Sequence, residues 1–169
     1  MPLKDPKEVF IMMLSDVQRN AERSTKFYQE VADVAQDDEI KELLKARGLI
    51  SDSILTRLNE CFKLIGAQPV KLDGKIHDVF VEDFRRELAT IESPLAKRLF
   101  VLAKLSHLLH LRVGEYVALT AAADITGNYA VGVLLESCLA DKLALVERTR
   151  RLIRERIRER VAERIGATA

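Results

Sequence analysis

Residues 38–66 read DEIKELLKARGLISDSILTRLNECFKLIG, and this stretch has the pattern of one long helix. Apolar side chains such as Ile40, Leu44 and Leu58 recur at steps of three or four, so they share one face of an α-helix. Gly66 follows Ile65 at the position where a glycine commonly ends a helix. The stretch therefore predicts a helix from about residue 38 to Ile65, with one face buried.

The chain on the N-terminal side repeats this pattern. Asp5 followed by Pro6 is a typical helix start, and apolar residues continue at helical spacing from Val9 to about residue 36. Two long helices that are joined by so short a break fold back on each other as an antiparallel hairpin. We therefore expect residues 6–65 to form such a hairpin.

Three more helices are predicted on the C-terminal side. A loop with Pro69 and Gly74 leads into a short helix over residues 76–90, and Ser93-Pro94 starts a long helix that ends near residue 126. The last helix runs from about Tyr129 to residue 165. The predicted fold class is all-α, an up-down-up-down four-helix bundle with a short extra helix between the second and third long helices. We expect one domain over residues 1–169.

Composition and charge agree with this fold and exclude several functions. Seven Gly, four Pro, no Trp and 5% aromatic residues are typical of a helical protein. The 27 basic and 26 acidic side chains give a net charge of +1, so no overall field attracts nucleic acid or an anionic membrane. Neither a signal-like N-terminus nor a membrane-spanning stretch is found. Cys61 and Cys138 lack metal or redox spacing and are expected to be buried free thiols. We expect a cytoplasmic protein.

Residues 147–169 form an arginine-rich C-terminal extension of the last helix. Between Glu147 and Arg164 there are eight arginines and four glutamates, beside an apolar stripe that includes Ile153, Ile157 and Val161. This pattern favours an amphipathic helix that packs on the bundle or on a second copy of the chain. Contact with nucleic-acid phosphates is the alternative, and the interspersed glutamates and missing aromatic residues argue against it.

A four-helix bundle can hold two metal ions through Glu and Glu-x-x-His motifs on facing helices. No Glu-x-x-His motif occurs in this chain. His107 and His110 are one helical turn apart, but neither has a carboxylate three or four residues away. The other histidine, His77, falls in the short helix. The acids that are scattered over the long helices are interpreted as solvated or ion-paired side chains. They are Glu22, Asp52, Glu115, Asp141 and Glu147.

No catalytic machinery is indicated either. The chain shows no local pairing of a nucleophile with a base and no glycine-rich phosphate loop. We therefore predict no catalytic residues, no cofactor and no enzyme activity. The sequence names no small-molecule ligand.

Several motifs resemble the YciF/YciE-like branch of the ferritin-like proteins, which are bacterial proteins associated with stress responses. The start of the first helix, with Glu8-Val9-Phe10-Ile11 and then Leu14-Ser15-Asp16, is similar to the start of that family. Leu55-x-Arg57-Leu58, Tyr116-x-x-Leu119, and Leu134-Leu135 before Leu139 resemble its later helices. The resemblance covers about residues 7–150 and implies a ferritin-like bundle, a stress context and a homodimer.

The metal-ligand positions that the resemblance implies carry other residues in this chain. The first carboxylate position falls on Ala21, with Glu22 one residue later, and the second-helix motif falls on residues 49–52. The third-helix motif falls on residues 108–112 and keeps only His110. The last falls on Asp141, Lys142 and Val146. About four carboxylates are needed to neutralise two metal ions, and apolar or basic residues stand at most of these positions.

The sequence thus predicts a non-catalytic ferritin-like bundle that has lost its di-metal site and acts as a structural or binding module. It is expected to form a homodimer. The alternative is a di-iron or di-manganese oxidase or storage protein with an altered ligand set. That set would comprise Glu22, Asp52, His110 and Asp141, with His107 beside His110 as a further candidate.

Overall fold

A computed structural model of the chain describes residues 5–34, 38–71 and 74–166, and these residues form five helices and their loops without strands. The helices are α1 (Pro6–Val34), α2 (Asp38–Ile65), α3 (Ile76–Ala89), α4 (Pro94–Ile125) and α5 (Tyr129–Gly166). The predicted all-α class is confirmed. The predicted end of the first helix near residue 36 lies outside the described residues.

Side chains and glycines set the helix ends. The carboxylate of Asp5 accepts a hydrogen bond of 2.9 Å from the backbone N–H of Lys7 at the start of α1. Ser93 accepts one of 3.4 Å from the N–H of Ala96 at the start of α4, and a proline follows each cap. Gly66 ends α2 with a φ of 63°, in the left-handed region that glycine adopts without strain.

The α2–α3 connection returns along the bundle beside α1. Arg19 donates to the backbone carbonyl of Gly74 at 2.9 Å, and Arg23 donates to Asp78 at 2.6 Å. Both contacts join residues that are 55 positions apart in the chain. Because the difference in residue number is the same for both contacts, the two segments run in the same direction. Helix α3 therefore lies parallel to α1.

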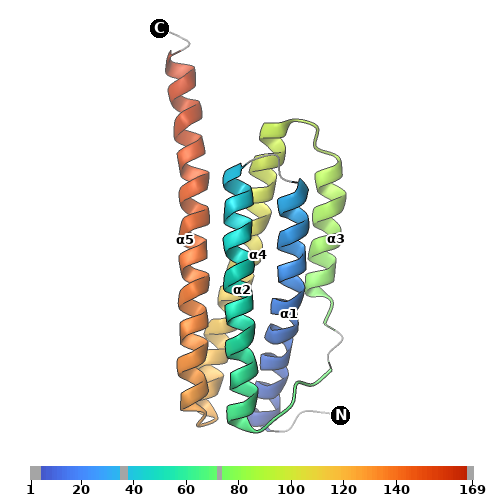
Figure 1. Cartoon of the computed structure of the whole chain (residues 1–169), viewed down its shortest axis with the longest axis vertical. Coiled ribbons are helices and arrows are strands. Elements are labelled where there is room, and N and C mark those ends of the chain that lie inside the picture. The colour runs from blue at the N-terminus through green and yellow to red at the C-terminus, as the bar shows by residue number, and fades with distance from the viewer. Residues whose placement is uncertain (1–4, 35–37, 72–73, 167–169) are drawn as a thin grey trace.

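This connection sets the directions of the long helices. The connection and α3 together carry the chain back to the other end of the bundle. For this reason α4 runs in the same direction as α2, and α5 runs in the same direction as α1 (Figure 1). The four long helices therefore run up, down, down and up, so the predicted up-down-up-down order of the long helices is wrong. The short helix α3 supplies the extra reversal. The neighbouring pairs α1–α2, α2–α5, α4–α5 and α1–α4 are then all antiparallel. The C-terminal part of α5 extends beyond the other helices.

The apolar core consists of two clusters along the bundle axis. The first cluster lies at the end where α4 turns into α5, and the second at the opposite end. Members of the first cluster include Phe10, Leu14, Leu58, Leu119 and Leu135. Members of the second include Phe27, Leu43, Leu102, Leu105 and Phe84 of α3. The two clusters leave the middle of the bundle to other residues.

None of the helices, over the part of the chain that the structure describes, combines the length and the apolar character needed to cross a membrane.

Candidate functional site

Six polar side chains are buried between the two apolar clusters, and we call them the polar belt. Along each long helix, these residues lie between the members of one cluster and the members of the other. The polar belt comprises Ser24 of α1, Arg47 and Ser51 of α2, Arg112 of α4, and Lys142 and Thr149 of α5. Three of the six carry a positive charge. Such charges are rarely buried unless they are paired, so the polar belt is the candidate site of this protein.

Arg47 is the most deeply buried member, with 0% of its surface exposed. Its Nη2 donates a hydrogen bond of 2.9 Å to the hydroxyl of Thr149, and its guanidinium carbon lies 5.4 Å from the ring centre of Tyr28. Its Nε and Nη1 have no hydrogen-bond partner, and neither does the nearby hydroxyl of Ser51. Burial lowers the pKa of Arg47, but a guanidinium keeps its proton in proteins. The positive charge therefore stays in the core.

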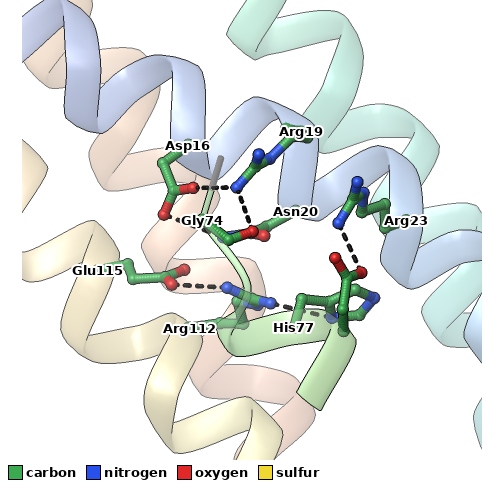
Figure 2. Close-up of polar contacts among 9 residues, drawn as sticks. Asp16, Arg19, Asn20, Arg23, Gly74, His77, Arg112 and Glu115 are labelled. Atoms are coloured by element: carbon green, nitrogen blue, oxygen red, sulfur yellow. Dashed lines mark hydrogen bonds and ion pairs between the residues drawn. The ribbon is translucent and has the colours of Figure 1, made fainter. Parts of the chain in front are cut away.

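Arg112 connects the polar belt to α3. Its Nη1 forms a 2.6 Å ion pair with Glu115, and its Nη2 lies 3.3 Å from Nδ1 of His77 (Figure 2). The Nε of Arg112 has no partner, and one oxygen of Glu115 is buried without one. Burial raises the pKa of Glu115, although the hydrogen bond and charge of Arg112 act in the opposite direction. This ion pair therefore neutralises one of the three cations only at the expense of burying a carboxylate.

Lys142 of α5 is the third buried cation of the polar belt. Its side chain is 4% exposed, and among the described residues it forms no hydrogen bond or ion pair. Burial, and then the positive charges of Arg47 and Arg112, lower its pKa to about 8. The two charge contributions place Lys142 within electrostatic reach of both arginines. The polar belt is thus a positively charged centre with one paired carboxylate.

The acids and histidines that were considered as metal ligands do not come together. Glu22, Asp52 and His107 are exposed, each on a different helix. His110 is also exposed, and its Nδ1 lies 2.8 Å from the backbone carbonyl of Ser106. Within the described ranges, no group of three or more His, Cys, Asp or Glu residues is placed to hold a metal ion.

The remaining acids mostly form ion pairs, as the sequence predicted. Asp141 accepts a hydrogen bond from Arg57 across the α2–α5 contact. Glu147 pairs with Arg150 at 3.5 Å on the exposed side of α5. Glu115 differs from the prediction of a solvated face, because most of its side chain is buried against Arg112.

The structure identifies two polar-belt residues that the sequence analysis missed. Ser51, Arg112 and Lys142 stand at positions that the family resemblance had marked, and Ser24 lies on the predicted stripe of the first helix. Arg47 and Thr149 were not singled out. The sequence pattern could have identified both residues. Each stands at the three- or four-residue spacing of the apolar residues on its own helix, and a polar residue at such a position is buried. His77 was placed correctly in the short helix, but its burial against Arg112 was not predicted.

Four long helices that are packed in this way, with polar groups at mid-height in the core, define the class of ferritin-like helical bundles. The chain belongs to the family described as "Domain of unknown function (DUF892)", which matches residues 5–162. The predicted resemblance to the YciF-like proteins is thereby confirmed.

Two solved structures share the fold. The E. coli stress protein YciF has a TM-score of 0.84 and 16% identity, over 89% of this chain and 95% of that chain. YcfI from Rhodopseudomonas palustris, named as a candidate structural protein, has a TM-score of 0.83 and 16% identity, over 87% and 94%. At this identity the likeness concerns the fold alone. No curated protein matches the chain in sequence.

Proposed function

We propose that this chain is a non-catalytic ferritin-like bundle that acts as a structural or binding module in the bacterial cytoplasm. The observation that carries the proposal is the burial of Arg47, Arg112 and Lys142 in the middle of the core. The names of the two similar structures, a stress protein and a candidate structural protein, support a stress-associated structural role.

The residues of the polar belt do not fit a di-metal centre. Two metal ions need carboxylates and neutral imidazoles as ligands, and about four negative charges to balance them. A guanidinium and an ammonium have no free electron pair to donate, and each repels a cation. The one carboxylate beside them, Glu115, is already bound to Arg112. The polar belt therefore supports a metal-independent role.

Elemental analysis tests this proposal. The protein is purified without a metal-affinity tag, incubated with Fe(II) or Mn(II) under anaerobic conditions, and desalted. We expect well below one equivalent of bound metal per chain. Two equivalents per chain would overturn the proposal.

A control variant distinguishes specific from incidental metal binding. It neutralises the whole altered ligand set, with the changes Glu22→Gln, Asp52→Asn, His110→Gln and Asp141→Asn. We expect this variant and the unchanged chain to retain the same small amount of metal, because these four side chains do not converge. A loss of bound metal in the variant alone would support the oxidase or storage alternative.

We also propose that the module is a homodimer of one domain over residues 1–169, with residues 147–169 as its extension. Large apolar side chains are exposed near the turn between α4 and α5, where a second copy would cover them: Val117, Ile125, Tyr129 and Val133. The predicted stripe at Ile157 and Val161 lies outside the side chains that the structure describes.

Light scattering after size exclusion is expected to give twice the chain mass. Val133→Glu should yield a monomer, whereas Leu49→Glu, an equally exposed site on α2, should not.

A further inference from the structure

We propose that the polar belt binds one small inorganic anion, of the size of chloride, beside Arg47 and Lys142. This inference rests on the proposed metal-independent role. It assigns a ligand to the place in the core where related bundles would hold cations.

The first step is the set of buried polar atoms without partners. The Nε and Nη1 of Arg47 and the hydroxyl of Ser51 are enclosed and make no hydrogen bond. Arg47 and Ser51 are four residues apart on α2, so both side chains lie on the same face of the helix. Buried polar groups are nearly always hydrogen-bonded, and unpaired ones call for a partner such as a water molecule or an ion. Three such atoms on one helix face therefore indicate a common partner.

The second step is the charge. Within the described residues, Arg47 contacts a hydroxyl and an aromatic ring, and neither it nor Lys142 forms an ion pair. Removing an unpaired cation from water is strongly unfavourable, and an arginine cannot relieve it by losing a proton. One negative charge beside these two groups would offset the repulsion between them and that with Arg112.

The third step is the chemistry of the ligand. A guanidinium and an ammonium offer only hydrogen-bond donors, and the Ser51 hydroxyl can donate as well. A ligand that accepts from all of them is an anion. Leu108 and Leu109, which precede Arg112 on α4, are fully buried, so the core beside the polar belt is apolar. A monatomic anion needs the least space there, which favours chloride over a large organic acid.

An approach from solvent exists on the α3 side. A groove of about 350 Å³ between α1 and α3 is lined in part by Arg23, His77 and Arg85. His77 forms its inner wall and contacts Arg112 of the polar belt (Figure 2). Both groove arginines form ion pairs, Arg23 with Asp78 and Arg85 with Glu30, so the groove offers a path toward His77 without a net positive field.

Chemical unfolding at constant ionic strength tests the site. Sodium gluconate is replaced stepwise by sodium chloride, and the unfolding equilibrium constant is measured by urea titration. A ligand that binds only the folded state makes the unfolding constant inversely proportional to the ligand concentration, once that concentration exceeds the Kd. We expect a decrease that approaches tenfold for each tenfold rise in chloride. An unfolding constant that does not depend on chloride would overturn the proposal.

Matched variants assign the effect to the belt. Arg47→Met removes the buried charge while it keeps a long apolar stem, so the variant is expected to fold and to lose the chloride response. Arg148→Met removes the same charge from an exposed position on α5 and should keep the response. Equal chloride responses in both variants would show that chloride acts elsewhere.

Crystals grown with bromide give a direct readout. We expect an anomalous peak within hydrogen-bond distance of Arg47 and Lys142. Bromide only at the surface would contradict the proposal. Metal analysis remains a separate test: two bound metals would overturn the metal-independent role, whereas a metal-free core without a chloride response would overturn only the anion site.

Discussion

The Nη2 of Arg112 lies 3.3 Å from the Nδ1 of His77, in a buried contact between a guanidinium and an imidazole. Because the guanidinium is always protonated, it donates this hydrogen bond and the Nδ1 of His77 accepts it. The imidazole is therefore neutral in the folded protein. Burial, and then the charge of Arg112, lower the pKa of His77 to about 4.

This contact predicts a loss of stability in acid. The unfolded chain binds a proton at His77 near pH 6.5, whereas the folded chain does so near 4, so the free energy of unfolding falls as the pH drops through this interval. The loss should reach up to about 3 kcal/mol. Urea titrations between pH 7 and 4 measure it. In His77→Gln, whose amide oxygen can still accept from Arg112, the acid loss should be smaller by that amount; an unchanged pH profile would contradict the assignment.

Lys142 predicts a slope of the same sign in alkali. Its folded pKa of about 8 lies below the value of 10.5 for an exposed lysine, so the unfolded chain binds more protons between these values. This group therefore adds stability as the pH rises from about 8 to 10.5. The thiols of Cys61 and Cys138 act against it above pH 9, because burial raises their pKa. A comparison with Lys142→Met cancels their contribution.

The Lys142→Met comparison has a defined outcome. At pH 7 in chloride-free buffer, the variant should be more stable than the unchanged chain, since a buried, unpaired ammonium is replaced by an apolar side chain. This advantage should shrink by up to about 3 kcal/mol by pH 10.5. Urea titrations of both proteins measure it. An advantage that stays constant with pH would show that Lys142 does not titrate in this range.

The two cysteines should be unreactive in the folded protein. Both are buried free thiols, as the sequence predicted, and burial raises the pKa of Cys61 to about 12. Thiolates are the reactive species, so modification by a disulfide reagent at pH 8 should proceed only as fast as the protein unfolds. A cysteine introduced at Leu49, which is 74% exposed, should react at once. Rapid modification of either native cysteine would contradict the buried placement.

The ion pair between Arg57 and Asp141 gives a test of local stability. Both side chains are partly exposed, so Asp141→Asn should lower the free energy of unfolding by only about 0.5–1 kcal/mol. Asp52→Asn, at an exposed position of α2 without an ion pair, should change it by less than about 0.5 kcal/mol. Thermal unfolding compares the two. Equal effects would mean that the ion pair contributes nothing.

The helices could be predicted from the sequence because their signals are local. Apolar spacing, Asp5 and Ser93 as caps, and Gly66 as a terminator act within a few residues, and the structure has all of them. The directions of the long helices could not be predicted in the same way. They depend on where the connection after α2 packs, and that is decided by contacts with α1 such as the hydrogen bond from Arg19 to Gly74.

The candidate site was also predicted only in part from the sequence. Reading the chain alone establishes that few acids stand where a di-metal centre would need them and that basic residues replace some of them. Only packing reveals that Arg47, Arg112 and Lys142 come from three helices into one buried layer. The reason is physical: the burial of a charge depends on what surrounds it in space, and residues far apart in the chain provide those surroundings.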